Sequence, residues 1–169
     1  MGNKMMEVLV DKVTLNIGVG KAGQELENAK DLLERLSGAK AVSTHAKVRN
    51  PVFHIKKGDA IGTKATLRGP SAIEFVKKAL KVKGFALPQR SFDKEGNFSF
   101  GVPEYIEFPG AKYDPQIGML GFDVCVTLRR RGFRVGRRRR GKSHVGAGHR
   151  LTKQDGIEFA KGVLSIKVE

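Results

Sequence analysis

Three stretches of the sequence alternate apolar and polar side chains with a period of two: residues 12–19 (KVTLNIGV), 60–69 (AIGTKATLRG) and 121–132 (GFDVCVTLRRRG). Because successive strand residues point to opposite faces, each stretch is predicted to be a strand with one buried side. The inward set is Val13, Leu15, Ile17, Val19, Thr63, Ala65, Leu67, Phe122, Val124, Val126 and Leu128. Half-buried strands favour an antiparallel or mixed sheet with one open face, since a doubly wound parallel sheet would have almost continuously apolar strands.

Three other segments have helical patterns. Residues 25–38 repeat leucines at helical spacing and end at Gly38, a second helix starts at Pro70 and ends at Gly84, and a third follows a capping-box-like Thr152 and Asp155. Short strands are expected at 40–47 and 50–59, a hairpin at 91–102, an extended segment at 104–108 and a loop at 109–120. The sequence therefore predicts one α+β domain over residues 1–169, with an antiparallel (mixed) β-sheet, helices packed on one face and an open face.

The charge of the chain is high and uneven. The formal net charge is +15, from 32 Lys plus Arg against 17 Asp plus Glu, and the pI is about 10.2. Residues 129–150 hold nine arginines, one lysine and no acidic residue, so this Arg/Gly-rich segment supplies +10 of that total. A domain this basic usually binds a polyanion. Like-charge repulsion and glycine favour a flexible segment in the free protein, inserted as a loop before the C-terminal helix.

Two patterns resemble nucleotide-binding motifs. Residues 136–143 (GRRRRGKS) match the P-loop, but HVGAGHR is a poor helix start and a phosphate cradle would have to hold four adjacent positive charges. Residues 18–23 (GVGKAG) match the dinucleotide fingerprint and lie between a strand and a helix. Residues 37–49, however, contain no acidic residue for the ribose. A dinucleotide-dependent oxidoreductase remains an alternative that only this second pattern motivates.

No other catalytic or metal-binding pattern stands out. The four histidines lack ligand-like spacing, and the single cysteine, Cys125, is expected to be an ordinary sheet residue in a reducing compartment. No serine lies in a nucleophile-elbow pattern. We therefore expect no enzyme activity, no metal and no cofactor. No apolar run is long enough to span a membrane, and the N-terminus lacks the apolar core of a signal peptide, so a cytoplasmic location is expected.

The outward faces of the alternating strands indicate a partner. They carry hydroxyls, an amide, glycine and cations, with Asp123 as the exception: Thr14, Asn16, Gly18, Lys64, Thr66, Arg68, Thr127 and Arg129. Cations bind phosphate, and short Thr and Asn side chains can reach a base edge or a 2′-hydroxyl. Arginine predominates over lysine in the basic segment, which favours bidentate phosphate contacts. An RNA-binding face is the favoured interpretation. A plain solvated face and a generic DNA-binding architectural protein, motivated by charge alone, are the alternatives.

Four motifs in register over about residues 8–132 closely resemble one family: TLNIGVG, AIGTKATLRG, SFDKEGNFSFGV and EYIEFPGAKYD. That family is large-subunit ribosomal protein five, called eleven in eukaryotes, which docks 5S ribosomal RNA. The basic segment and the helix after it are similar to the archaeal and eukaryotic form. The resemblance implies an α+β fold and a place in the central protuberance of the ribosome. It also implies contacts with 5S rRNA, 23S rRNA, peptidyl-site tRNA, small-subunit protein thirteen and other central-protuberance proteins, and no membrane partner.

The resemblance matches Asn16, Thr66 and Arg68 to strand residues that face 5S rRNA and, together with the outward and basic residues described above, gives three expected groups of site residues. The expected 5S rRNA-binding set is Thr14, Asn16, Gly18, Lys40, Thr44, Lys64, Thr66 and Arg68. The expected tRNA-contact set, in the stretch from Lys47 to Gly62, is Lys47, Arg49, Lys56 and Lys57. The expected 23S rRNA-binding set is Arg129, Arg130, Arg131, Arg134, Arg137, Arg138, Arg139, Arg140, Lys142 and Arg150. One departure is Ala39, where the bacterial pattern has Gln, so that one RNA contact is expected to be either absent or replaced by Lys40.

Overall fold

The computed structural model describes residues 3–168. Its centre is a five-stranded sheet of order β2-β3-β1-β6-β5, in which every neighbouring pair is antiparallel. The strands are β1 (Val8–Gly18), β2 (Ala41–His45), β3 (Ala60–Leu67), β5 (Phe98–Val102) and β6 (Phe122–Arg130). A separate parallel pair joins β4 (Ala86–Leu87) to β7 (Lys167–Val168). The antiparallel sheet of an α+β fold is thus confirmed.

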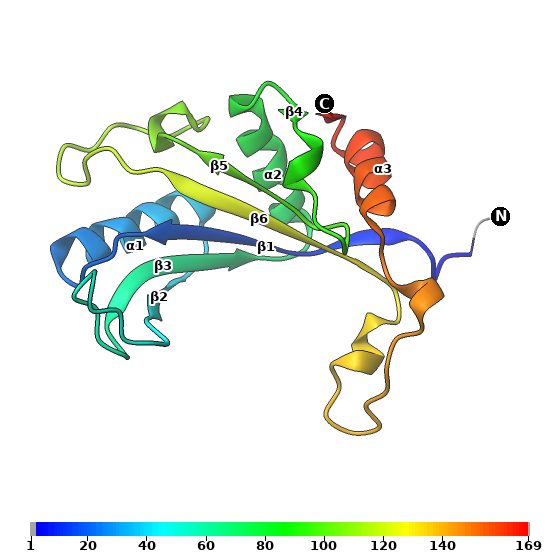
Figure 1. Ribbon diagram of the computed structural model, residues 1–169. Helices are drawn as coiled ribbons and strands as arrows, with labels where there is room; N and C mark the ends of the chain where they lie inside the picture. Colours follow the sequence, from blue (N-terminus) through cyan, green and yellow to red (C-terminus); the bar gives the residue numbers. More distant parts are fainter. Residues whose placement is uncertain (1–2, 169) are drawn as a thin grey trace.

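Helices cover one face of this sheet. The helix α1 (Gln24–Ser37) packs on β2 and β3, and α2 (Pro70–Val82) packs on β1 and β6; both lie behind the sheet in Figure 1. As predicted, Gly38 ends α1 in the left-handed conformation with φ 65°, and Pro70 occupies the first turn of α2. Inward strand residues such as Leu15 and Val124 are completely buried against helix residues such as Leu33 and Leu80. This apolar layer leaves the opposite face of the sheet open.

Two local predictions are wrong. Residues 50–59 are not a strand: Asn50 and Ile55 form an isolated bridge that closes a tight turn, in which the Asn50 side chain accepts a hydrogen bond from the Val52 N–H at 3.1 Å. Residues 104–108 are not extended, because Tyr105–Glu107 form a 3-10 turn, η2. This turn directs both Tyr105 and Phe108, three residues apart, into the core, where each is buried. Core burial therefore outweighs the β-forming character of these side chains.

The hairpin predicted for residues 91–102 is only half present. Its second arm is β5, but its first arm is replaced by a 3-10 turn, η1 (Gln89–Ser91), followed by a single bridge from Phe92 to Phe98. The Asp93 carboxylate accepts hydrogen bonds from the backbone N–H groups of Glu95 and Asn97, which closes the turn. The strand β5 therefore pairs with β6 alone and forms one edge of the sheet.

The basic segment lies between β6 and the C-terminal helix α3 (Lys153–Val163). It forms a loop away from the sheet, with two 3-10 turns, η3 (Phe133–Gly136) and η4 (Ala147–His149), as Figure 1 shows. We refer to residues 131–151 as the basic loop. Its expected flexibility in the free protein stays a prediction.

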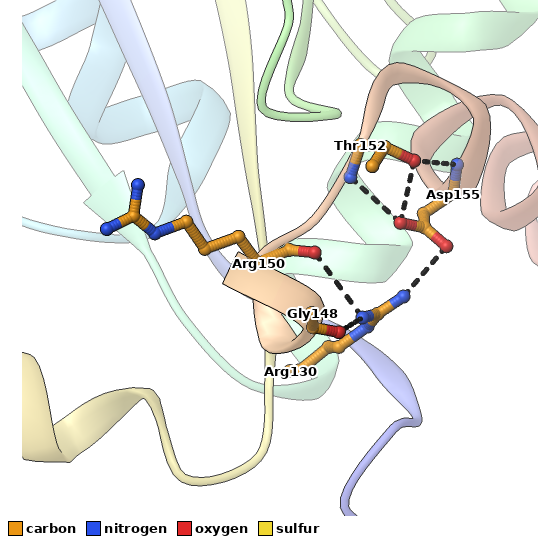
Figure 2. A network of polar contacts seen from close by, with 5 residues as sticks. All are labelled: Arg130, Gly148, Arg150, Thr152 and Asp155. Carbon is orange, nitrogen blue, oxygen red and sulfur yellow. Dashed lines mark hydrogen bonds and ion pairs between the residues drawn. The ribbon is translucent and has the colours of Figure 1, made fainter. Parts of the chain in front are cut away.

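A polar clasp fixes both ends of the basic loop (Figure 2). Arg130, at the end of β6, donates to the Gly148 and Arg150 carbonyls, each at 3.3 Å, and to the Asp155 carboxylate at 2.8 Å. Asp155 also accepts from the Thr152 backbone N–H at 2.8 Å, and the Thr152 hydroxyl accepts from the Asp155 N–H, so the predicted capping box of α3 is confirmed. One carboxylate thus joins the strand, the loop and the helix.

We expect Asp155→Asn to lower the free energy of unfolding by about 1–2 kcal/mol at pH 7, since it weakens a cap and removes a partly buried ion pair. Partial burial alone would raise the pKa of Asp155, but hydrogen bonds from Thr152 and the charge of Arg130 outweigh it and lower the pKa. The folded-state pKa is thus below the unfolded value of about 3.9, and the stabilisation is lost as pH falls through the folded-state pKa. Urea unfolding should therefore show a gap to wild type that is full at neutral pH and narrows once the pH falls below the unfolded value of about 3.9. Glu158→Gln, exposed on the same helix, should show no such gap.

Candidate nucleic-acid interface

The register of the sheet aligns the outward polar residues in rows across the strands. Asn16 lies directly opposite Lys64 on β3 and Asp123 on β6, and Thr14 lies opposite Thr66 and Cys125. These side chains are exposed or half-buried, whereas the alternating residues Val13, Leu15 and Ile17 are buried. The predicted division into a buried and an open face is thus correct for all three alternating stretches. We call the open side, formed by the outward residues of β1, β2, β3, β5 and β6, the open face.

All members of the expected 5S rRNA set lie on the open face or at its margin. Gly18 and Thr44 both lie opposite Gly62, where a Cβ atom would be 2.7 Å from the Ile17 carbonyl oxygen, so only glycine fits at that position. Lys40 directly precedes β2 and Arg68 directly follows β3, and both side chains are exposed. Residues that are far apart in sequence therefore form one surface with hydroxyl, amide and cationic groups.

Asp11, which the sequence analysis did not single out, organises one end of this surface. A β-bulge in β1 between Val10 and Lys12 accompanies this residue, and its carboxylate is only 4% exposed. Three guanidinium groups surround it: Arg137 Nη1 at 2.9 Å, Arg129 Nε at 3.3 Å and Arg68 Nη1 at 3.7 Å. The sequence does contain an indication of this cluster. Asp11 lies two residues before Val13, at the spacing of the inward-facing residues, and an acid at a buried position must have cationic or hydrogen-bonding partners. The open face and the basic loop are thus joined at one buried carboxylate.

The expected 23S rRNA set separates into arginines paired with a carboxylate and exposed cations that have no carboxylate partner among residues 3–168. Arg130 has a side chain only 10% exposed, and its guanidinium is engaged in the clasp, so in this structure it serves the fold. Arg131 pairs with Glu7 at 3.1 Å, and Arg137 stacks on the Phe133 ring at 4.6 Å as well as binding Asp11. Arg129 binds Asp11 at 3.3 Å. Among the exposed cations, Arg138 donates to the Gly141 carbonyl at 2.7 Å and Arg150 to the Val145 carbonyl at 3.3 Å. The exposed cations without an acidic partner among residues 3–168 are Arg134, Arg138, Arg139, Arg140, Lys142 and Arg150.

The expected tRNA-contact residues lie together on the loop between β2 and β3. Lys47, Arg49, Lys56 and Lys57 are all exposed. Backbone hydrogen bonds from Ala46 to Asp59 at 2.8 Å and from Gly58 to Ala46 at 2.9 Å close the base of this loop. Its tip is apolar, with Val52 80% and Phe53 69% exposed, a feature that the sequence analysis did not weigh.

The two nucleotide-binding patterns lack the structural context that they require. The GVGKAG segment follows β1, but β1 has only antiparallel neighbours, so no parallel βαβ unit surrounds it. The GRRRRGKS segment lies in the basic loop and is followed by the three-residue turn η4 rather than by a helix. Within residues 3–168, no group of three or more His, Cys, Asp or Glu side chains could hold a metal ion. Across the same described residues, no helix is sufficiently long and apolar to cross a membrane.

Comparison with known proteins gives one consistent family. The family model described as ribosomal protein L5 matches residues 3–56, and the model that describes the C-terminus of the same ribosomal family matches residues 60–159. The chain is 48% identical to the large ribosomal subunit protein uL5 of Archaeoglobus fulgidus, over 95% of this chain and 90% of that protein. It is 45% identical to the uL5 of Sulfolobus acidocaldarius (98% and 93% covered) and 47% identical to that of Nanoarchaeum equitans (99% of each). The chain therefore belongs to the ribosomal protein L5 family and is a structural, non-enzymatic constituent of the large ribosomal subunit, similar in form to these archaeal members.

Proposed function

We propose that this protein binds 5S rRNA through the open face and attaches it to the central protuberance of the large subunit. The observation that supports this proposal most is the alignment of Thr14 with Thr66 and of Asn16 with Lys64 on an uncovered sheet face. Hydroxyl and amide groups at these positions can bond to ribose hydroxyls and base edges, while Lys64 and Arg68 bind phosphates. An uncovered sheet face of this kind suits the wide, shallow minor groove of an RNA helix or an exposed RNA loop.

The basic loop and the loop between β2 and β3 extend this proposal to other partners. The exposed cations of the Arg/Gly-rich segment, residues 129–150, would contact 23S rRNA. Lys47, Arg49, Lys56 and Lys57 would reach peptidyl-site tRNA, and the same end of the molecule would form a bridge to small-subunit protein thirteen. The two loops project from different parts of the sheet in Figure 1, which allows one protein to contact several partners at once.

A gel-shift comparison of 5S rRNA, tRNA and duplex DNA tests the proposed function. We expect 5S rRNA to bind most tightly, and the double variant Asn16→Ala with Thr66→Ala to bind it roughly tenfold more weakly, since two hydrogen bonds of about 0.5–1.5 kcal/mol each are lost. Gln154→Ala, exposed on α3, is the control and should bind normally. Equal binding of the three nucleic acids, unaffected by the double variant, would contradict the proposal and favour a generic DNA-binding or polycationic role.

A further inference from the structure

The open face carries one acidic side chain among the outward positions of its five strands. Asp123 on β6 is exposed, lies opposite Asn16 on one side and Gly101 on the other, and takes part in no ion pair among residues 3–168. By contrast, the other carboxylate at the edge of this surface, Asp11, is buried among three arginines. An unpaired carboxylate on a surface for RNA repels phosphates, so its place there requires a partner that brings hydrogen-bond donors.

A shallow hollow surrounds this carboxylate. Its volume is about 500 Å³, and its lining includes Asn16, Asp123, Lys83 and three glycines, Gly18, Gly101 and Gly121. A Cβ atom at Gly101 would lie 3.3 Å from Asp123 Oδ1, so the carboxylate extends over the glycine and toward the edge strand β5. At Gly18 no atom lies within 4 Å of the place of a Cβ, and at Gly101 only the Asp123 carboxylate does, so a flat group can approach the carboxylate from the open side. At Gly121 the Pro103 carbonyl oxygen fills that place and forms part of the wall.

The chemistry of the hollow selects among the four bases. A carboxylate offers two acceptors and no donor, and the Watson–Crick edge of guanine offers two adjacent donors, N1–H and N2–H. Cytosine and adenine each place an acceptor beside their amino group, and uracil has a single donor between two acceptors. Unpaired bases are the usual targets of sequence-specific RNA recognition because that edge is then accessible. The Asn16 amide can donate to guanine O6, and the Lys83 ammonium at the rim can bind a phosphate.

We infer that Asp123, with Asn16, forms a subsite that recognises the Watson–Crick edge of one unpaired guanine in the bound RNA. This inference rests on the proposed function, since it assumes that the open face docks 5S rRNA. Asp123 then acts as a specificity-determining residue, whereas Lys64 and Arg68 supply affinity without reading sequence.

Asp123→Asn separates this inference from a simple charge effect, because the two predict changes of opposite sign. The variant is isosteric and exposed, and its urea midpoint should match that of wild type. If Asp123 reads guanine, replacing one acceptor by an NH₂ donor should weaken 5S rRNA binding by about tenfold or more. If the carboxylate only repels phosphates, the variant should bind more tightly, as removal of any negative charge would. Glu158→Gln on α3, which removes the same charge away from the open face, is the matched control.

A chemical footprint identifies the base. Kethoxal modifies guanine at N1 and N2, so one guanine that reacts in free 5S rRNA should be protected by wild type and should react again in the Asp123→Asn complex. Inosine at that single position, which lacks the N2 amino group, should weaken binding to wild type but not to the variant.

Unchanged or tighter binding by Asp123→Asn, with no guanine re-exposed, would overturn the inference. Thr66→Ala, which lies outside the hollow, separates failure of the guanine subsite from failure of the proposed function. If Thr66→Ala also leaves 5S rRNA binding unchanged, the open face does not bind 5S rRNA and the proposed function itself fails.

Discussion

Replacing Arg138, Arg139, Arg140 and Lys142 with glutamine is expected to reduce affinity for 23S rRNA by about 100- to 1,000-fold at 0.15 M salt. Each cation that neutralises a phosphate releases counterions, and each contact contributes about 0.7 to 0.9 to the slope of log K against log salt. These four side chains are exposed at the outer end of the basic loop, and none of them takes part in an ion pair among residues 3–168. Their removal should therefore act mainly on RNA binding and leave the sheet and helices intact, since the one side-chain hydrogen bond lost, from Arg138 to the Gly141 carbonyl, lies within the loop itself.

Filter binding between 50 and 300 mM salt would measure this effect, and the slope should become shallower by roughly 3. The matched control replaces four exposed helix lysines, Lys77, Lys78, Lys81 and Lys161, with glutamine. An equal loss of affinity in both variants would show that only total charge matters. Affinity for 5S rRNA should be nearly unchanged in the loop variant. Arg137 is left unchanged because it binds Asp11, which also binds Arg68 at the edge of the open face. Deletion of the whole loop would remove this contact and disturb the open face as well.

The faces of the strands were predictable from the sequence because their period of two is a local property. The pattern in residues 60–69 correctly separates buried Ala65 and Leu67 from exposed Lys64 and Thr66. The starts of the helices at Pro70 and Thr152 were also predictable, since proline and capping residues act within one turn. The resemblance of four motifs to one family agreed with this local analysis, and the family is now shown.

The elements that were mispredicted depend on distant contacts. Tyr105 and Phe108 adopt a 3-10 turn because the core accepts both rings, and the Tyr105 hydroxyl accepts a hydrogen bond from the Asp114 N–H at 2.9 Å. Local propensity contains no information about that partner. The Asp11 cluster depends on Arg137, which is 126 residues away in sequence, and on a bulge that no pattern predicted. Register between strands, which places Asp123 beside Asn16, is likewise set by tertiary pairing and turn geometry.

The central claim, that RNA covers the open face, can be tested with the single cysteine of the chain. Cys125 is exposed on β6, between Thr14 of β1 and Ser99 of β5, in the middle of that face. Partial burial, together with the charge of Asp123, raises the pKa of the Cys125 thiol. Because the reactive species is the thiolate, alkylation by iodoacetamide should be followed at about pH 8.5, and its rate should increase further as pH rises.

We expect saturating 5S rRNA to protect Cys125 almost completely. At an RNA concentration 100 times Kd, about 1% of the protein is free, so the alkylation rate should decrease by about 100-fold. A matched control carries Cys125→Ser with Gln154→Cys, which moves the thiol to an exposed position on α3, where RNA should leave the rate unchanged. The decisive measurement is therefore the rate of Cys125 alkylation with and without 5S rRNA. A decrease of about 100-fold is the result that our account predicts, and an unchanged rate in a fully formed complex would contradict it.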